Sequence, residues 1–195
     1  MDQIDSLASR AATPPEGRLF YVVGASDAGK DQLLSYARGH LGDSRPVVFA
    51  HRYVARQEAS AENQIGLSAA EFAMRKRHGL FAMSWEGKGR HYGIGTEINY
   101  WLAMGLSVVV KGSRAYLGQA LKAYPDMTVI WVTAEGDAPA TRPSRRAREF
   151  RMGRAPHEPF MAPVALGLRI VHIRNSGTLK LAGDKLLSVL AGRAD

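Results

Sequence analysis

Short apolar runs and longer mixed segments alternate along the chain, and this pattern predicts strands that alternate with helices. Five runs are apolar at most positions: residues 19–23, 47–50, 106–110, 127–132 and 168–173. Such strands are typical of a parallel sheet that is covered on both faces. The covering helices are expected at residues 30–41, 96–104, 115–123 and 178–191. The chain is therefore predicted to have an α/β fold, with a parallel sheet of about five strands and helices on both faces.

The alternation breaks between residues 51 and 95. Residues 51–67 show no clear period and are expected to form a loop. Ser68 and Glu71 have the spacing of a capping box, which predicts a helix that ends near residue 77. A strand over 81–85 and a hairpin-like turn follow. We interpret residues 51–95 as a small insertion into the parallel sheet.

Composition agrees with one folded unit. The chain has 195 residues, 46% of them hydrophobic, which is enough for a sizeable core. We expect residues 1–17 to be a flexible leader and residues 18–195 to form a single domain. The absence of cysteine excludes disulfides and thiolate metal sites and is compatible with a cytoplasmic protein. No apolar run has the length of a membrane span, so no membrane partner is expected.

The formal net charge is +8, which suits either nucleic acid or small polyphosphate ligands. Six arginines lie within residues 142–154 without aromatic residues at the spacing of a base-stacking platform. We therefore expect no nucleic-acid partner. From charge alone, this segment is equally a solvated basic face or a lid that binds anions.

The motif with the clearest chemistry directly follows the first strand. Its eight residues read G-x-x-x-x-G-K-D: Gly24, Ala25, Ser26, Asp27, Ala28, Gly29, Lys30 and Asp31. Between a buried strand and a helix, such a loop cradles phosphate oxygens with its backbone N–H groups, and its lysine reaches the outer phosphates. We therefore predict a nucleoside triphosphate site.

Asp31 departs from the usual motif, which has Ser or Thr to ligate Mg²⁺ at this position. Asp31 would hold Mg²⁺ through water, since this ion tends to keep several waters. Alternatively, it is a carboxylate that the helix dipole stabilises.

Polar residues follow three of the predicted strands: Gly24–Lys30, His51–Arg56 and Lys111–Arg114. Ligands of parallel sheets bind beyond the carboxyl ends of the strands, so these exits should converge on one cleft.

Several ordered motifs carry a resemblance to a known family. They are Gly29-Lys30-Asp31, Ala50-His51-Arg52-Tyr53, Glu62-Asn63-Gln64-Ile65, Leu80-Phe81-Ala82-Met83-Ser84-Trp85, Tyr92-Gly93-Ile94-Gly95, Gly112-Ser113-Arg114-Ala115 and Asn175-Ser176-Gly177. Together they resemble the ribose 1,5-bisphosphate phosphokinase family of bacterial phosphonate degradation, a guanylate kinase-like branch of the P-loop kinases. The resemblance covers residues 19–133 and resumes at residue 175.

The resemblance implies that ATP, with Mg²⁺, donates its γ-phosphoryl group to the anomeric phosphate of ribose 1,5-bisphosphate. The product would be 5-phosphoribosyl 1-diphosphate. A phosphate nucleophile is already ionised at neutral pH, so catalysis would depend on positioning and charge neutralisation. Lys30 and Asp31 would act at the donor, and the insertion would bind the acceptor. The oligomeric state is not predicted.

Candidates for binding the acceptor are Arg52, Arg56, Tyr92, Ser113 and Arg114. A guanidinium grips phosphate with two parallel hydrogen bonds, although each arginine alone could be a surface ion-pair partner. Tyr92 is equally a phosphate ligand or a packing residue.

Kinases of this type close a lid over ATP, and here the segment that would form it, residues 134–163, looks shortened. Pro139 and Pro143 argue against a long helix. Arg145 and Arg148 are the candidates for the lid's charge-stabilising role. A guanylate-type nucleoside monophosphate kinase and a non-catalytic nucleotide-binding relative are the alternative functions.

Overall fold

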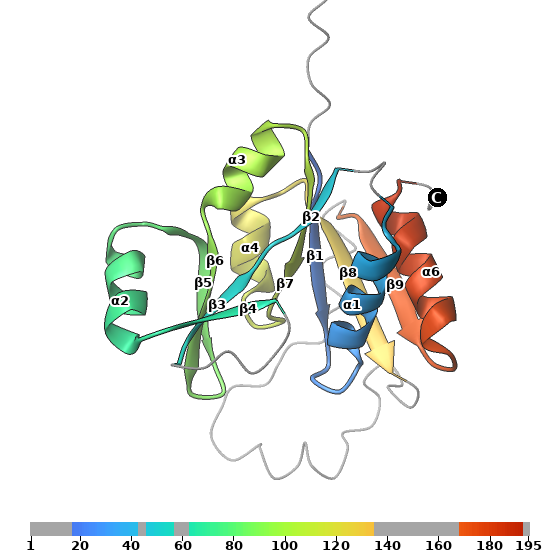
Figure 1. Cartoon of the computed structure of the whole chain (residues 1–195), viewed down its shortest axis with the longest axis horizontal. Coiled ribbons are helices and arrows are strands. Elements are labelled where there is room, and N and C mark those ends of the chain that lie inside the picture. The colour runs from blue at the N-terminus through green and yellow to red at the C-terminus, as the bar shows by residue number, and fades with distance from the viewer. Residues whose placement is uncertain (1–16, 43–45, 57–62, 135–167, 193–195) are drawn as a thin grey trace, which may run out of the picture.

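A five-stranded parallel sheet forms the centre of the molecule (Figure 1). The computed structural model describes residues 17–42, 46–56, 63–134 and 168–192. The sheet has the order β2-β7-β1-β8-β9, and every neighbouring pair is parallel. Its strands are β1 (Leu19–Gly24), β2 (Val47–Phe49), β7 (Ser107–Lys111), β8 (Thr128–Ala134) and β9 (Ile170–Asn175). The predicted α/β fold and parallel sheet are confirmed.

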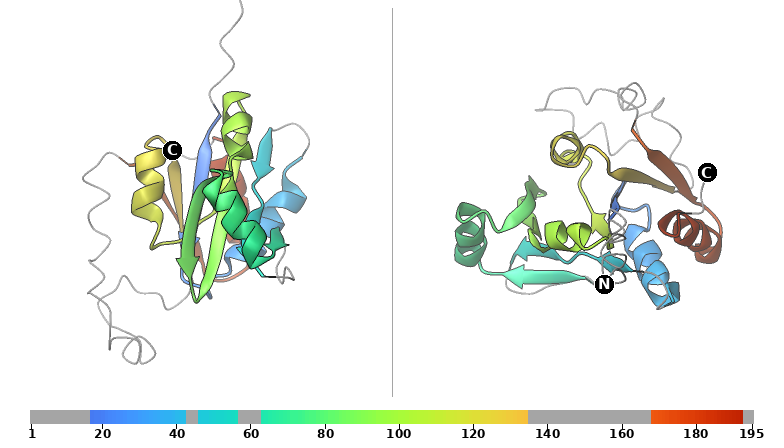
Figure 2. Two further views of the ribbon diagram at one scale, coloured as in Figure 1. Left: turned by 90° about the vertical axis from the view of Figure 1, so that its left-hand side faces the viewer. Right: turned by 90° about the horizontal axis from the view of Figure 1, so that it is seen from above.

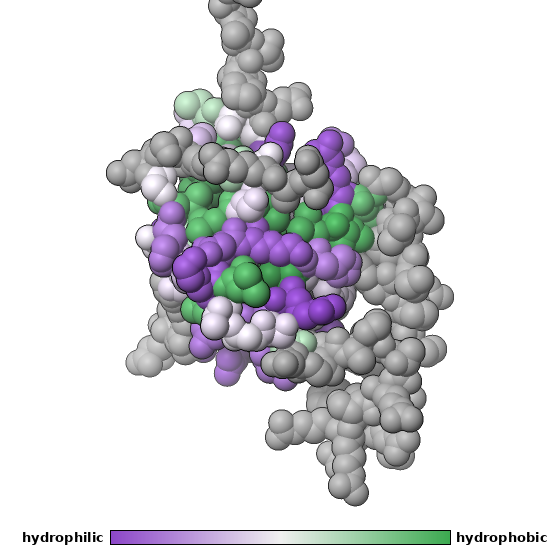
Figure 3. Space-filling model, turned by 90° about the vertical axis from the view of Figure 1, so that its right-hand side faces the viewer, coloured by the Kyte–Doolittle hydropathy of each residue, from purple (hydrophilic) through white to green (hydrophobic). Residues whose placement is uncertain are grey.

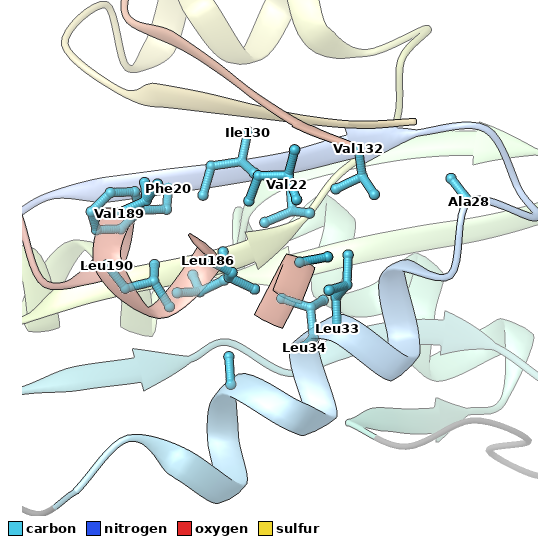
Figure 4. Packing of buried hydrophobic residues seen from close by; sticks show 14 residues of the cluster. Phe20, Val22, Ala28, Leu33, Leu34, Ile130, Val132, Leu186, Val189 and Leu190 are labelled. Carbon is cyan, nitrogen blue, oxygen red and sulfur yellow. The ribbon is translucent and has the colours of Figure 1, made fainter. Parts of the chain in front are cut away.

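Helices cover both faces of this sheet because side chains alternate across each strand. On one face, Phe20 and Val22 of β1 pack in a cluster with α1 (Lys30–His40) and α6 (Leu179–Leu190). Figure 4 shows this cluster, with Leu33 and Leu186 facing the sheet. On the other face, Tyr21 packs in a second cluster with α3 (Glu97–Ala103) and α4 (Leu117–Ala123).

The views in Figure 2 place α1 and α6 next to each other. Helix α6 is amphipathic, with Leu186 and Val189 buried while Lys180 and Asp184 form an exposed ion pair at 2.5 Å. The corresponding side of the molecule mixes hydrophilic and hydrophobic groups (Figure 3). The helix is therefore held mainly by its apolar face, since an exposed pair of this kind contributes little.

A second sheet of four strands is built from residues 52–95, in the order β4-β3-β6-β5. Its strands are β3 (Arg52–Ala55), β4 (Gln64–Leu67), β5 (Phe81–Gly87) and β6 (Arg90–Gly95). Helix α2 (Ala69–Arg77) follows β4, and the backbone N–H of Glu71 donates to Ser68 Oγ at 3.1 Å, as the predicted capping box requires.

The prediction of a loop over residues 51–67 is wrong where the structure describes this stretch. β3 and β4 pair in parallel there, with Arg52 opposite Gln64. Each strand has only four residues and most of them are half-buried. Short strands with polar and glycine positions lack the continuous apolar run by which the central strands were found.

Among the described residues, no helix is long and apolar enough to span a membrane. The segment with Arg145 and Arg148 lies outside the described residues, as do residues 1–16 of the expected leader.

Candidate nucleotide-binding site

The phosphate loop connects the end of β1 to the start of α1, and the end of β9 braces it. Gly29, the N-cap of α1, has φ 69°, a left-handed conformation that favours glycine. A side chain at Gly29 would collide with the amide nitrogen of Asn175, the last residue of β9. That amide donates to the carbonyl of Ala28 at 3.0 Å. The loop is therefore fixed from two sides before any ligand binds.

Lys30 is the one buried charged residue among those the structure describes, with 7% of its surface exposed. Its ammonium group donates to the carbonyl of Gly24 at 3.1 Å and also to that of Ala25. Burial, helped by the neighbouring charge of Lys111, lowers its pKa from 10.5 to about 8. Phosphate oxygens are better acceptors for a buried ammonium than two neutral carbonyls, so the loop is prepared for an anion.

Asp31 forms an ion pair with Lys111, the last residue of β7. The Asp31 side chain is 56% exposed and that of Lys111 only 19%. Burial lowers the pKa of Lys111, while the hydrogen bond to Asp31 counteracts this shift. The carboxylate is therefore accessible to solvent and placed beside the phosphate loop.

One pocket brings Asp31 and Lys111 together with Arg52 of β3, and Asn63 and Gln64 also line it. One carboxylate and two cations, from α1, β7 and β3, therefore line the same pocket. Asn63 has φ 61°, and its amide donates to the carbonyl of Ala50 at 2.9 Å. The backbone N–H of Arg52 donates to the carbonyl of Asn63 at 3.1 Å, which ties β3 to the segment before β4.

Arg52 is the clearest unsatisfied donor of the site. Its Nε atom is buried and has no hydrogen-bond partner among the described residues. The guanidinium lies 4.9 Å from the ring centroid of Tyr92, and burial lowers its pKa. A buried donor without a partner is costly unless a ligand satisfies it, and a guanidinium suits phosphate.

The other residues predicted to bind the acceptor, Arg56, Tyr92, Ser113 and Arg114, do not line this pocket. Tyr92 supports Arg52 and stacks on Trp85 at 5.8 Å. Arg56 follows β3, and its backbone N–H donates to the carbonyl of Val54 at 2.9 Å. Arg114 is exposed and close enough to Lys30 that its charge contributes to the lowered pKa of that lysine.

Ser113 is held by a buried tyrosine of the central strand. The Tyr21 hydroxyl donates to the carbonyl of Ser113 at 3.1 Å and accepts from its backbone N–H at 2.9 Å. Burial raises the pKa of Tyr21, so it stays a neutral donor. Gly112 is required here because a side chain would strike the Tyr21 ring. The backbone of the Gly-Ser-Arg motif is thereby fixed at the end of β7.

Lys111 was predicted only as part of a polar strand exit at the cleft, Asn175 only as part of a family motif, and Tyr21 not at all. Lys111 and Asn175 each end a strand of the parallel sheet, which was the available signal, because ligands bind at that edge. Nothing in the sequence shows that the hydroxyl of Tyr21, in an apolar run, reaches Ser113.

Two known proteins each match 90% of this chain. The ribose 1,5-bisphosphate phosphokinase PhnN of Laribacter hongkongensis is 45% identical over 176 residues, which are 90% of this chain but 43% of that longer protein. The protein of the same name from Thiobacillus denitrificans is 43% identical over 183 residues, covering 90% of this chain and 94% of that protein. The chain belongs to the ribose 1,5-bisphosphate phosphokinase PhnN family. The resemblance found in the sequence is confirmed, although no model of a protein family matches the chain.

The fold of this PhnN-family chain is that of a P-loop kinase. A guanylate kinase from Anaplasma phagocytophilum superposes with a TM-score of 0.62 at 12% identity, covering 91% of this chain and 86% of that one. At this identity the likeness concerns the fold alone. It agrees with the predicted P-loop kinase architecture.

Proposed function

We propose that this chain transfers the γ-phosphoryl group of ATP to the anomeric phosphate of ribose 1,5-bisphosphate, forming 5-phosphoribosyl 1-diphosphate in phosphonate degradation. One observation carries the proposal: a phosphate loop with a buried lysine adjoins a pocket whose arginine has an unsatisfied buried donor. The relatives' name supplies the substrate class. Because both substrates occur inside cells, the proposal includes a cytoplasmic location.

The donor side would require little rearrangement to receive ATP. Backbone N–H groups of the loop and the start of α1 receive the phosphates of ATP. The Lys30 ammonium leaves the carbonyls of Gly24 and Ala25 for phosphate oxygens and neutralises charge that develops during transfer. Asn175 and the left-handed Gly29 keep the loop in place during this exchange.

The acceptor side supplies positive charge rather than a general base. Arg52 grips an acceptor phosphate through the nitrogen that lacks a partner, and Lys111 lies in the same pocket. The attacking oxygen belongs to a phosphate that is already ionised, so no proton has to be removed by a strong base. The chain's task is to hold two anions close together and in line.

Asp31 is suited to hold Mg²⁺ through the ion's bound waters. Among the described residues, no group of three or more His, Cys, Asp or Glu side chains could hold a metal. Mg²⁺ is commonly bound through one or two carboxylates together with substrate phosphates and waters, and one exposed Asp31 carboxylate meets that requirement. When bound, the ion would neutralise negative charge on the phosphates during transfer. Asp31 would then exchange its pairing with Lys111 for a contact to the ion's waters.

A coupled assay tests this function. Purified chain, ATP, Mg²⁺ and ribose 1,5-bisphosphate are expected to yield 5-phosphoribosyl 1-diphosphate, with one ADP formed for each product molecule. Lys30→Ala serves as the enzyme blank, and GMP as the competing acceptor. Absence of product from the folded wild-type chain, or faster turnover of GMP than of the sugar bisphosphate, would overturn the proposal.

A further inference from the structure

A second lysine reaches the phosphate loop, and it comes from the other sheet. Lys88 lies at the tip of the β5–β6 hairpin, and its ammonium group donates to Ser26 Oγ at 3.1 Å. The two residues are 62 positions apart in the chain. This is a direct side-chain link between the four-stranded sheet and the loop that binds phosphate.

The hairpin turn presents Lys88 in an unfavourable backbone conformation. Lys88 and Gly89, the two central residues, have φ values of 51° and 68°. Two positive φ angles are characteristic of a type I′ turn, which prefers Asn, Asp or Gly at both positions. A lysine at the first position therefore costs stability that asparagine would avoid. Strain of this kind at a site is grounds to look for a function of the side chain.

The contact with Ser26 does not by itself account for this cost. Lys88 and Ser26 are both exposed, and an exposed hydrogen bond contributes little to stability. The same region already holds Lys30, with Lys111 and Arg114 close enough to lower its pKa. Adding another cation here is unfavourable without a ligand and favourable once several negative charges enter the loop.

We propose that Lys88 is a phosphate-binding residue of the ATP site, donating from the hairpin to a triphosphate oxygen at Ser26. Ser26 belongs to the phosphate loop, so an anion that fills the loop lies within reach of an ammonium already bonded to Ser26 Oγ. Lys88 would place positive charge between the donor and acceptor phosphates, which repel each other. It would also bring the four-stranded sheet against the loaded loop. The inference rests on the proposed function for the identity of the acceptor, but not for the contact with ATP.

The experiment compares three variants by calorimetric titration with Mg²⁺–ATP and by steady-state kinetics. Lys88→Asn removes the charge and suits the left-handed turn, so it should fold normally with an unchanged or higher melting temperature. Lys88→Arg keeps the charge. Arg90→Gln is the matched control, because it removes an exposed charge from the same hairpin two residues away.

Lys88→Asn is expected to weaken ATP binding about 10- to 100-fold, as loss of a charged hydrogen bond predicts, and to lower kcat/KM at least as much. Lys88→Arg should retain most of the affinity, and Arg90→Gln should bind ATP like the wild type. If Lys88→Asn binds ATP as tightly as Arg90→Gln does, the proposal is overturned. A wild-type chain that binds ATP but does not phosphorylate the sugar bisphosphate would instead contradict the proposed function, and the titrations would still decide the role of Lys88.

Discussion

The two sheets of this molecule differ in how deeply the residues of their strands are buried. In the parallel sheet, Leu19–Val23 of β1 are buried, with at most 5% of each residue exposed. In β3 of the four-stranded sheet, only Val54 is buried, and Arg52 lines the pocket together with Asp31 and Lys111. The parallel sheet therefore fixes the phosphate loop through packing, whereas the four-stranded sheet presents charged groups, Arg52 at the pocket and Lys88 at Ser26 of the loop. In the proposed function, the parallel sheet would set the geometry of the phosphate loop, and the four-stranded sheet would supply positive charge to the phosphates of the substrates.

Lys30→Ala should have the largest effect, because it removes the charge that the parallel sheet positions. We expect kcat/KM to fall about a thousandfold, the scale of losing one preorganised charge-stabilising group. Steady-state kinetics measures it, and circular dichroism should show an unchanged fold. An activity loss below tenfold would show that the donor loop does not direct the chemistry.

Arg52→Lys tests the four-stranded sheet. Lysine keeps the charge but lacks the planar guanidinium fork, which in Arg52 lies 4.9 Å from the ring centroid of Tyr92. KM for the sugar bisphosphate should rise about 10- to 100-fold, as for loss of a charged hydrogen bond, while ATP affinity changes little. Arg77→Lys, an exposed position of α2, is the control. An equal loss of ATP affinity would contradict the assignment of Arg52 to the acceptor.

Gly29→Ala should destabilise the protein by about 1–2 kcal/mol, the cost of a left-handed residue with a side chain. The added methyl group would also push away Asn175. Gly118→Ala is a matched control in α4, where a side chain meets nothing within 4 Å. It should stabilise by about 0.5–1 kcal/mol. Urea unfolding measures both, and equal values for the two variants would contradict the close fit of the loop.

The pH dependence should be the smallest effect. Because the pKa of Lys30 is about 8 in the free protein, the ammonium loses its proton as the pH rises through 8. Phosphate binds the charged form, so ATP affinity should fall up to about tenfold between pH 7 and pH 9.

The folded state binds fewer protons than the unfolded state between pH 8 and 10.5, so Lys30 makes the free energy of unfolding rise with pH in that window. In Lys30→Arg, whose side chain stays charged, ATP affinity should not change between pH 7 and pH 9.

The same contrast explains what could be predicted from the sequence. The central strands were found because burial on both faces demands continuous apolar runs. β3 and β4 were missed because half-buried strands of four residues carry Arg52, Gln64 and Gly66 in no regular order. Their pairing depends on partners far along the chain, such as the antiparallel register of Val54 with Tyr92.

The parts of the site that lie in one contiguous segment could be predicted from the sequence, and the contacts between distant residues could not. The phosphate loop is contiguous, so its glycines and Lys30 could be recognised in one segment. Arg52 could be named, but its buried unsatisfied nitrogen depends on the packing around it. The pairing of Asp31 with Lys111 joins residues 80 positions apart, and no spacing rule indicates it. Arg145 and Arg148 lie outside the described residues, so their assignment to a lid stays a prediction.

Phosphorus NMR of the complete reaction is the decisive measurement, because it shows which oxygen receives the phosphoryl group. With ATP, Mg²⁺ and ribose 1,5-bisphosphate, we expect the coupled signals of a diphosphate to replace the anomeric monophosphate signal, while the 5-phosphate signal persists and ADP accumulates in equal amount. Accumulation of ADP and inorganic phosphate with both sugar phosphate signals unchanged would contradict the proposed function.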